Sequence, residues 1–300
     1  MTDVVAIDVG GTRLKATVVT DGRVGDVVSR STAGLHGGEL TALLNATVAE
    51  LARTRLVGGV GVAVPGIVDH GRVVSLPGKF DGLVGRDLAA DVAAAVDVPV
   101  VVVNDAIAAG VGEATSGAGA GHRRVVVMTI GTGIGTAVVE DGCPLGFGPW
   151  GGGLMGGQIP IAPGDAGPVD TSGQRGTIEA LCAAERLVDA ARANGCGVED
   201  VSNLLARWQA GDSGARSAVS AYRVFLERAL VALVQAHTPS IVVVGGGPVS
   251  TSSDWLLAGM SDAIARRLWW GQECAVVPAA LGDAAALVGV AALVEQRPRR

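Results

Sequence analysis

The strongest constraint on the fold of this chain is a short sequence that occurs twice, 120 residues apart. Residues 11–22 read GTRLKATVVTDG and residues 131–142 read GTGIGTAVVEDG. Both copies follow a run rich in β-branched residues, Val4–Val9 and Val125–Ile130, and both end in Asp-Gly. This pattern predicts a strand, a tight Gly-Thr turn, a second strand and an Asp-Gly turn. Two equivalent hairpins indicate two equivalent half-molecules.

The turns of the two copies consist of small residues, so their backbone N–H groups can approach an anion closely. The first copy, within DVGGT (8–12), adds a hydroxyl at Thr12 and a carboxylate at Asp8, and Mg²⁺ prefers oxygen ligands of this kind. A gapless alignment puts Met128 opposite Asp8, so we expect only the first copy to serve a metal ion. An ordinary hairpin is the alternative for one copy alone, whereas two copies favour a phosphoryl donor held between two lobes.

Composition and charge exclude several classes of protein. The chain has 300 residues, which suffices for two domains, and its net charge of −6 argues against non-specific nucleic-acid binding. Its four cysteines form no CxxC pair, which argues against a cysteine zinc site and for reduced thiols. We expect a cytoplasmic protein, because no basic-then-apolar leader is present and no apolar run reaches the roughly 18 residues of a membrane span.

Alternating strands and helices predict an α/β protein. We expect a first α/β lobe over residues 1–118, joined by a C-terminal helix over 283–296, and a second over 119–282. Residues 66–82 and 148–176 are expected to be irregular. Periodicity and apolar runs predict strands near 3–9, 13–19, 23–30, 57–64, 100–103, 123–130, 134–140, 241–244 and 273–277, and helices near 39–55, 85–96, 105–115, 177–193, 198–209, 214–237, 254–269 and 283–294.

Three further features carry candidate chemistry. Asn104 and Asp105 follow an all-valine run and open an alanine-rich helix, where both residue types are preferred caps. Asp105 could instead accept the proton of a hydroxyl that attacks phosphorus, which is worth about 10²–10⁴-fold in rate. The Gly245-Gly246-Gly247 turn either admits a flat ligand such as adenine or simply joins strand to helix. Glu179 begins a helix, where it either contacts substrate or stabilises the helix N-terminus.

Together these stretches resemble the ROK family, the bacterial sugar kinases and sugar-sensing repressors of the actin-like ATPase superfamily. The resemblance covers nearly the whole chain and implies a two-lobed actin-like ATPase (ribonuclease H-like) fold with a central cleft. The matching motifs are DVGGT (8–12), VAVPGIVD (62–69), LPG (76–78), VVNDAIAAGVGE (102–113), TIGTGIGTAVVEDG (129–142), GTIEA (176–180), VVVGGGP (242–248) and LGDAAALVGVA (281–291).

The resemblance implies ATP-dependent phosphorylation of a hexose hydroxyl, usually at C6, with Asp105 as the general base. It implies a dimer or tetramer, of which we expect the homodimer, and Mg²⁺ held by Asp8 through water. The residues carried over for ATP are Asp8, Gly10, Gly11, Thr12, Arg13, Gly131, Thr132, Gly133, Gly245, Gly246 and Gly247. Those carried over for the sugar are Gly66, Ser75, Gly78, Asn104, Asp105, Gln158 and Glu179.

The chain also departs from the family pattern. Where the family usually has G-E-I-G-H, this chain has Gln158 for the Glu and Ile161 for the His, and Ser75 replaces an Asn. The cysteine-rich zinc loop is absent, so we expect no zinc and a loop held by packing. These changes indicate altered specificity, and an amino sugar such as kanosamine, from antibiotic biosynthesis, is a candidate substrate beside glucose.

Other functions remain open at this point. A non-catalytic sugar sensor (pseudokinase) is the main alternative, because Gln158 and Ile161 alter the sugar pocket. A transcriptional repressor would need a helix-turn-helix segment, for which the sequence before the first strand leaves no room. An actin-like filament or chaperone ATPase would not need the sugar-side motifs. Polyphosphate is an alternative donor to ATP.

Overall fold

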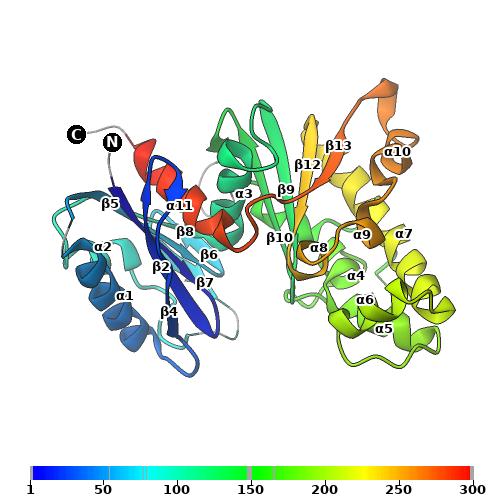
Figure 1. Ribbon diagram of the computed structural model, residues 1–300, viewed down its shortest axis with the longest axis horizontal. Helices are drawn as coiled ribbons and strands as arrows, with labels where there is room; N and C mark the ends of the chain where they lie inside the picture. Colours follow the sequence, from blue (N-terminus) through cyan, green and yellow to red (C-terminus); the bar gives the residue numbers. More distant parts are fainter. Residues whose placement is uncertain are drawn as a thin grey trace. The chain divides into compact units, whose positions relative to one another are not determined.

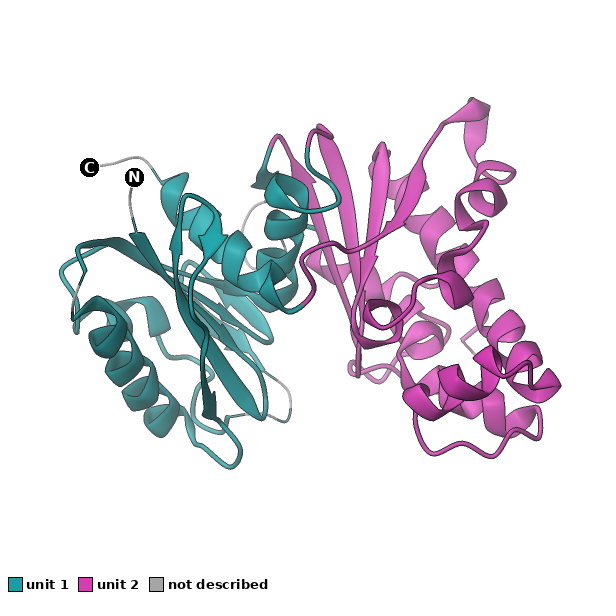
Figure 2. Ribbon diagram, viewed as in Figure 1, with its two compact units in different colours: residues 1–120, 142–153, 283–300 teal, residues 121–141, 154–282 magenta. Residues whose placement is uncertain are grey.

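The computed structural model describes residues 3–53, 55–76, 78, 80–146, 151–164 and 166–297 (Figure 1). Pro77 of the LPG motif and residues 148–150 and 165 of the expected irregular stretch lie outside these residues. The chain divides into two compact units: unit 1 comprises residues 1–120, 142–153 and 283–300, and unit 2 comprises residues 121–141 and 154–282 (Figure 2). The stretch 142–153 thus belongs to unit 1, although the sequence analysis places it in the second lobe.

Unit 1 is built on a mixed sheet in the order β3-β2-β1-β5-β8, with β4 also paired to β2. Strands β1, β5 and β8 are parallel, so their carboxyl ends meet at one edge, and β1 and β2 form an antiparallel hairpin. The elements of unit 1 are β1 (Asp3–Val9), β2 (Arg13–Thr20), β3 (Arg23–Val24), β4 (Val28–Ser31), α1 (Gly37–Ala52), β5 (Val57–Val64), β6 (Ile67–Asp69), β7 (Arg72–Ser75), α2 (Leu88–Ala93), β8 (Val100–Asn104), α3 (Asp105–Ser116), β11 (Cys143–Pro144) and α11 (Ala285–Glu295).

Alternating side chains of β1 serve two cores, one on each face of the sheet. Val5, Ile7 and Val9 pack in a cluster with apolar residues of α1 and α2. Val4 and Ala6 pack in a second cluster with residues of α11. Unit 1 is therefore a three-layer α/β/α structure, with α3 and α11 together on one face (Figure 1).

Helices α3 and α11 approach closely because each has a glycine at the contact. A Cβ atom on Gly289 would overlap the carbonyl oxygen of Ala108, and one on Gly112 would overlap the carbonyl oxygen of Ala285. On the sheet beneath α11, a Cβ atom on Gly61 would lie 2.8 Å from both the Val290 side chain and its carbonyl oxygen. The position of the last helix thus depends on a few residues without side chains.

Unit 2 repeats the sheet plan in the order β10-β9-β12-β13, again with one antiparallel hairpin and parallel neighbours. One face of this sheet carries a large apolar cluster that includes Met128, Leu187, Leu230 and Trp255. The elements of unit 2 are β9 (Arg124–Ile130), β10 (Ile134–Glu140), the 3₁₀ turn η1 (Leu154–Gln158), α4 (Ile178–Cys182), α5 (Glu185–Ala193), α6 (Val201–Gln209), α7 (Ser213–His237), β12 (Ile241–Gly245), α8 (Gly247–Ser250), α9 (Asp254–Leu257), α10 (Met260–Ala265) and β13 (Ala275–Pro278).

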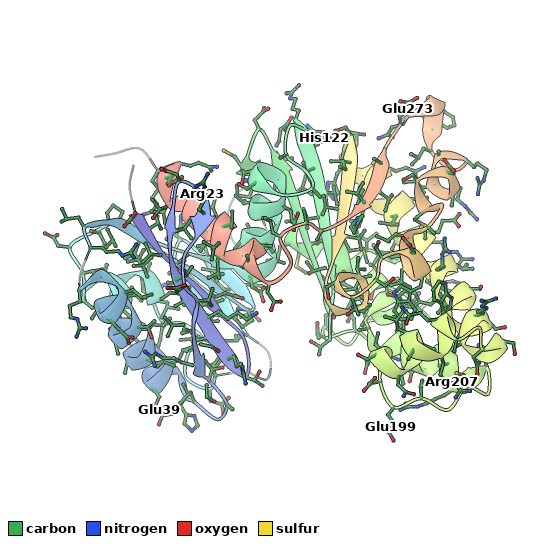
Figure 3. All side chains as sticks on the ribbon, in the orientation of Figure 1. Arg23, Glu39, His122, Glu199, Arg207 and Glu273 are labelled. Carbon is green, nitrogen blue, oxygen red and sulfur yellow. The ribbon has the colours of Figure 1, made fainter. Side chains whose placement is uncertain are left out.

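Several polar and charged side chains lie at the surface of the two units. Glu39 on α1 and Arg23 at β3 point to solvent in unit 1, as do His122 and Glu199 in unit 2 (Figure 3). None of the helices in the described part of the chain combines the length and the apolar character that a membrane span requires.

The hairpin repeat is real, but its register differs from the gapless alignment. Strands β1 and β9 have the same burial pattern when they are aligned at an offset of 121 residues instead of 120. The strand pairings agree: Val9 pairs with Leu14 in the first hairpin, and Ile130 pairs with Ile134 in the second. The first turn therefore contains one residue more than the second. The structural counterpart of Asp8 is Thr129, not Met128, which lies fully buried in the core.

Several expected elements differ in the structure. Part of the 66–82 stretch forms the β6–β7 hairpin, whose turn residues His70 and Gly71 both have positive φ (47° and 87°). The helices expected over 177–193 and 254–269 are each broken, the second at Gly259 with φ of 68°. The strand expected over 23–30 is divided into β3 and β4. The other predicted strands and helices are present within a few residues of their expected bounds.

Candidate active site

The carboxyl-end edge of the unit 1 sheet brings two predicted carboxylates together. Asp8 is the penultimate residue of β1, and Asp105 is the first residue of α3, directly after β8. Asp8 lies beside Ala63 of β5, and Val64 lies beside Asn104 of β8, so these residues end neighbouring parallel strands. Both carboxylates are half-buried, and Asp105 accepts a hydrogen bond from the Ala106 N–H at 2.9 Å.

Asp8 lies in an unusual electrostatic environment. Burial raises the pKa of Asp8 to about 6, and the neighbouring charge of Asp105 adds to the rise. Lys15 opposes this effect, while Asp283 contributes to it weakly. A cluster of negative charge that is costly to ionise is an environment that would favour a cation.

Sequence reasoning did not identify Lys15 and Asp283 as parts of this cluster. Lys15 is paired with Asp8 across the β1–β2 hairpin, and its Nζ lies 2.7 Å from Asp283 Oδ2. Asp283 is almost fully exposed, so the ion pair adds little to stability. The signal that could have found Lys15 is the hairpin register, which places it opposite Asp8.

The first glycine turn is closed by backbone hydrogen bonds and leaves its tip exposed. Gly10 donates its N–H to the carbonyl of Arg13 at 2.8 Å, and the Thr32 hydroxyl donates to the carbonyl of Gly10 at 2.7 Å. Gly11, Thr12 and Arg13 are all exposed. Their backbone and the Thr12 hydroxyl are therefore accessible to an anion next to Asp8.

The predicted sugar residues of unit 1 form two groups. Asn104 donates its side-chain N–H to the Gly66 carbonyl at 2.7 Å, and its Oδ1 accepts from the N–H groups of Ala106 and Ile107. Gly66 has φ of 85°, and a Cβ atom there would overlap the Ser75 carbonyl. Gly66, Ser75 and Asn104 are thus close together, whereas Gly78 is exposed with open space around it. Asn104 caps α3, which is the structural role that its residue type suggested.

In unit 2 the other two predicted nucleotide turns are close neighbours. Gly131 donates its N–H to the Gly133 carbonyl at 2.9 Å, and Thr132 is exposed at the tip of this turn. Gly246 has φ of 96°, and a Cβ atom there would overlap the backbone of Ile130. Glycine is therefore required at position 246, between exposed Gly247 and buried Gly245.

The predicted sugar residues of unit 2 lie beside the Gly131–Gly133 turn. Glu179 is buried on α4, and its Oε2 accepts the N–H of Ile134 at 3.0 Å. A Cβ atom on Gly133 would lie 2.7 Å from the same oxygen. Gln158 is half-buried at the end of η1, directly after Gly157, which lies against Ile134 and Glu179. Much of the hydrogen-bonding capacity of Glu179 is thus already satisfied by the protein.

The loop before α4 is held by a carboxylate that sequence reasoning missed. Asp170 is 7% exposed and accepts hydrogen bonds from Ser172, Gln174 and Thr177. Packing contributes as expected, because Ile159 and Ile161 lie against the apolar core of unit 2, but polar contacts to one buried side chain organise the rest of the loop. An aspartate followed by Thr-Ser-Gly is typical of a side-chain-supported turn, and this was the available signal.

The described residues do not fit a zinc ion at this loop. Residues 144–181 contain no Cys and no His, which are the usual zinc ligands, and the oxygens of Asp170 already accept protein hydrogen bonds. Across the described residues no group of three or more His, Cys, Asp or Glu side chains could hold a metal ion. Mg²⁺ needs fewer protein ligands, because it keeps several waters and binds phosphate oxygens with one or two carboxylates. Asp8 fits such a role.

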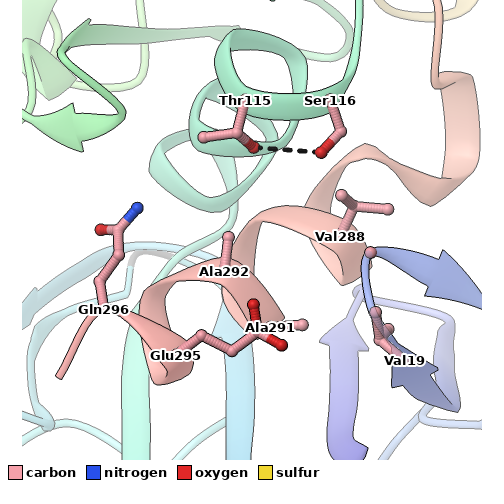
Figure 4. Close-up of a pocket in the computed structure, with 9 residues that line it drawn as sticks. Val19, Thr115, Ser116, Val288, Ala291, Ala292, Glu295 and Gln296 are labelled. Carbon is pink, nitrogen blue, oxygen red and sulfur yellow. Dashed lines mark hydrogen bonds between the residues drawn. The ribbon is translucent and has the colours of Figure 1, made fainter. Parts of the chain in front are cut away.

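Unit 1 also has a pocket of about 320 Å³ that contains none of the predicted site residues (Figure 4). Thr115 and Ser116 line it at the C-terminal end of α3, whereas Asp105 begins that helix. The 12 residues of α3 put these two ends about 16 Å apart. The pocket is therefore separate from the carboxylate cluster. Its lining comprises Val19, Gly22, Thr115, Ser116, Val288, Ala291, Ala292, Glu295 and Gln296.

A model of the ROK family matches residues 4–297 of the sequence. The chain belongs to the ROK family. Unit 1 and unit 2 are accordingly the two α/β lobes of the actin-like ATPase fold of this family's sugar kinases.

Known sugar kinases match the chain over most of its length. A glucokinase of Thermotoga maritima is 27% identical over 312 residues, which cover 98% of this chain and 97% of that protein. An N-acetylmannosamine kinase of Escherichia coli is 31% identical over 258 residues, 84% of each protein. The crystal structure of a ROK family glucokinase from Streptomyces griseus, in complex with glucose and AMPPNP, is 28% identical with a TM-score of 0.80 and covers 98% of this chain and 100% of that chain.

The fold alone does not separate enzymes from regulators. A ROK family transcriptional regulator is 20% identical with a TM-score of 0.84, and the match covers 98% of this chain and 78% of the regulator. The function of this chain therefore has to be argued from its site residues.

Proposed function

We propose that this protein is a sugar kinase that transfers the γ-phosphoryl group of ATP to a hydroxyl of a hexose or amino-hexose, at the 6-position. Asp105 acts as the general base that accepts the proton of the attacking hydroxyl. The glycine turns at 10–13, 131–133 and 245–247 bind the nucleotide. A homodimer, a cytoplasmic location and the absence of nucleic-acid binding belong to the same proposal.

The observation that carries this proposal is the pair of carboxylates at one end of the unit 1 sheet. Asp8 is the penultimate residue of β1, just before the first glycine turn, and Asp105 follows β8. Burial raises the pKa of Asp8, and the charge of Asp105 adds to the rise. One carboxylate suits the cation that accompanies ATP, and the other suits a substrate hydroxyl. Phosphoryl transfer needs mainly positioning and charge stabilisation, which agrees with a site made of turns and two acids.

Mg²⁺ would be held by Asp8 through water, together with the phosphate oxygens of ATP. When bound there, the ion neutralises charge on the transferred group. Asp8 itself must be ionised to attract the ion, so binding lowers the pKa of its carboxyl.

The substrate proposal depends on Gln158 and Ile161. A neutral amide replaces a charged acceptor at 158, and hydrogen bonds to charged groups are stronger than neutral ones by roughly 1 kcal/mol. This difference weakens the affinity for an ordinary hydroxyl about fivefold to tenfold. Glucose and N-acetylmannosamine are the substrates named for the relatives. Kanosamine and other amino sugars extend the set to be tested.

A non-catalytic sugar sensor is the second candidate. The same Gln158 and Ile161 favour it, and so do the protein hydrogen bonds that already engage Asn104 and Glu179. A sensor would bind sugar but would not turn over ATP.

The test is an assay of the purified protein with MgATP and a panel of glucose, N-acetylmannosamine, glucosamine and kanosamine. We expect one sugar to yield ADP and a sugar phosphate, and NMR of the product identifies the phosphorylated position. Replacement of ATP by polyphosphate in a parallel assay identifies the donor. In Asp105→Asn we expect kcat to fall by about 10²–10⁴-fold, because the base is lost.

The matched control is Asp97→Asn, an exposed aspartate of the same unit that should leave kcat unchanged. Sugar binding by calorimetry should persist in Asp105→Asn. Sugar binding by the wild-type protein without any phosphorylation would establish the sensor instead. Unchanged kcat in Asp105→Asn would exclude Asp105 as the base.

A further inference from the structure

Asp170 organises the loop that precedes α4. Its Oδ1 accepts the Ser172 N–H at 2.9 Å, the Ser172 hydroxyl at 2.7 Å and the Gln174 N–H at 2.9 Å. Its Oδ2 accepts the Thr177 hydroxyl at 2.8 Å. A buried acceptor with four donors fixes the loop from residue 170 to residue 177 in one conformation.

Two threonines connect this loop to Glu179. Thr177 is the N-cap of α4, and its hydroxyl accepts the Ala180 N–H at 3.2 Å while it donates to Asp170. Thr171 donates its N–H at 2.8 Å and its hydroxyl at 2.6 Å to Glu179 Oε1. The side chain of Glu179 is therefore held from the loop side by the residue that follows Asp170.

Glu179 continues the connection to the glycine turn of β9 and β10. Its Oε2 accepts the N–H of Ile134, the first residue after the Gly131–Gly133 turn. Gly133 lies so close to this oxygen that a Cβ atom would be only 2.7 Å away. A change in the loop at Asp170 can thus reach the predicted nucleotide turn through one carboxylate and one backbone amide.

The charge state of Asp170 suits this role. Burial alone would raise the pKa of Asp170, but the hydrogen bonds from Ser172, Gln174 and Thr177 together lower it. The carboxylate therefore stays ionised throughout the neutral pH range. Hydrogen bonds to an ionised acceptor are about twice as strong as neutral ones.

We propose that Asp170 is a positioning residue: its carboxylate fixes the loop through Ser172, Gln174 and Thr177 and thereby keeps Thr171 against Glu179, so that Glu179 and the Gly131–Gly133 turn are fixed without a metal ion. The part of this inference that concerns sugar binding rests on the proposed function. The part that concerns the fixed conformation of the Gly131–Gly133 turn does not depend on that function.

The first measurement is amide hydrogen exchange, which needs no assumption about activity. In Asp170→Asn we expect exchange of the peptide that covers residues 129–136 to accelerate at least about tenfold, because Glu179 is no longer held and the Ile134 N–H loses its fixed acceptor. Asp212→Asn is the matched control. Like Asp170, Asp212 is an aspartate of unit 2 whose carboxylate accepts protein hydrogen bonds: it is half-buried, caps α7 by accepting the Ala215 N–H at 2.8 Å, and pairs with Arg207. It has no contact with Glu179 among the described residues.

The second measurement is steady-state kinetics with MgATP and the preferred sugar of the panel. We expect KM for the sugar to rise about tenfold in Asp170→Asn, more than kcat falls, because a loosened loop weakens the hydrogen bonds from Thr171 that position Glu179. Thr171→Val, at an exposed position, should give a smaller change in the same direction. Thr171→Val takes the place of Asp170→Asn in both measurements if Asp170→Asn does not fold. Wild-type activity should survive 1,10-phenanthroline, which removes zinc and spares Mg²⁺.

Equal exchange at residues 129–136 in the wild-type protein and Asp170→Asn would overturn the proposal, as would equal acceleration in Asp212→Asn. If Asp170→Asn does not fold, unchanged exchange in Thr171→Val would overturn it instead. Loss of activity with phenanthroline would also overturn it. A wild-type protein that phosphorylates no sugar would contradict the proposed function alone, and the exchange result would then decide this inference by itself.

Discussion

Among single residues, Asp8 destabilises the folded protein when it is ionised, and it also has a proposed role in cation binding. Burial and the charge of Asp105 raise the pKa of Asp8 from 3.8 to about 6. A carboxyl whose pKa is raised in the folded state favours folding fully below its unfolded pKa, and this contribution is lost as the pH rises through about 6. At pH 7 the ionised Asp8 therefore destabilises the protein by up to about 3 kcal/mol.

We predict that Asp8→Asn raises the free energy of unfolding at pH 7 by up to about 3 kcal/mol while it abolishes kinase activity. Near pH 4 the two proteins should be almost equally stable, because Asp8 is then largely protonated. Urea denaturation at both pH values measures the difference. A loss of stability at pH 7, or an equal gain at both pH values, would contradict the raised pKa.

Among the elements, the contact between α3 and α11 depends most on residue size. We predict that Gly289→Ala lowers the free energy of unfolding by about 3 kcal/mol or more, because the added methyl group overlaps the backbone of α3. Gly38→Ala, the same substitution near the start of α1, has open space around it and should stabilise by up to about 1 kcal/mol. Thermal unfolding of both variants measures the contrast. A Gly289→Ala protein as stable as wild type would show that the helices can move apart at little cost.

Most elements could be predicted from local patterns. Alternation and apolar runs indicated the sheet strands, and the two Asp-Gly turns have positive φ at Asp21, Gly22, Asp141 and Gly142 as predicted. The break between α4 and α5 could not be predicted, because no Gly or Pro marks it. It coincides with tertiary hydrogen bonds: Ala184 donates to the carbonyl of Gly131, and the Tyr222 hydroxyl donates to the carbonyl of Cys182.

The candidate site could be predicted only where its residues carry local sequence signals. The glycine turns and the Asn104-Asp105 pair carry local signals, and the structure brings Asp8 near Asp105 as a parallel sheet requires. Lys15 and Asp283 meet across 268 residues of sequence, which no local pattern reports. The extra residue in the first turn shifted the counterpart of Asp8 to Thr129, and a gapless alignment cannot show a one-residue difference in strand register.

At the scale of the whole molecule, unit 2 is interrupted in sequence only by residues 142–153, whereas unit 1 is assembled from three stretches of chain. We predict that a chain that stops at Gly282, and so lacks α11, keeps unit 2 folded but leaves unit 1 unfolded. The reason is that Leu287, Val290 and Val294 complete the core on one face of the unit 1 sheet. Hydrogen exchange should show protection in β9 and β12 and none in β1 and β5. Protection of β1 in the shortened chain would contradict this dependence.

Helix α11 packs on the sheet of unit 1 although it follows unit 2 in the sequence, and this order affects synthesis in the cell. The ribosome releases the first 120 residues long before the helix that covers their sheet. Until α11 has been synthesised, the nascent polypeptide therefore exposes an apolar surface around Val4, Ala6 and Ala63, which chaperones can recognise. We therefore expect the yield of active protein to depend strongly on translation speed and chaperone supply. The dependence should be weaker for a protein in which each domain is one contiguous stretch of sequence.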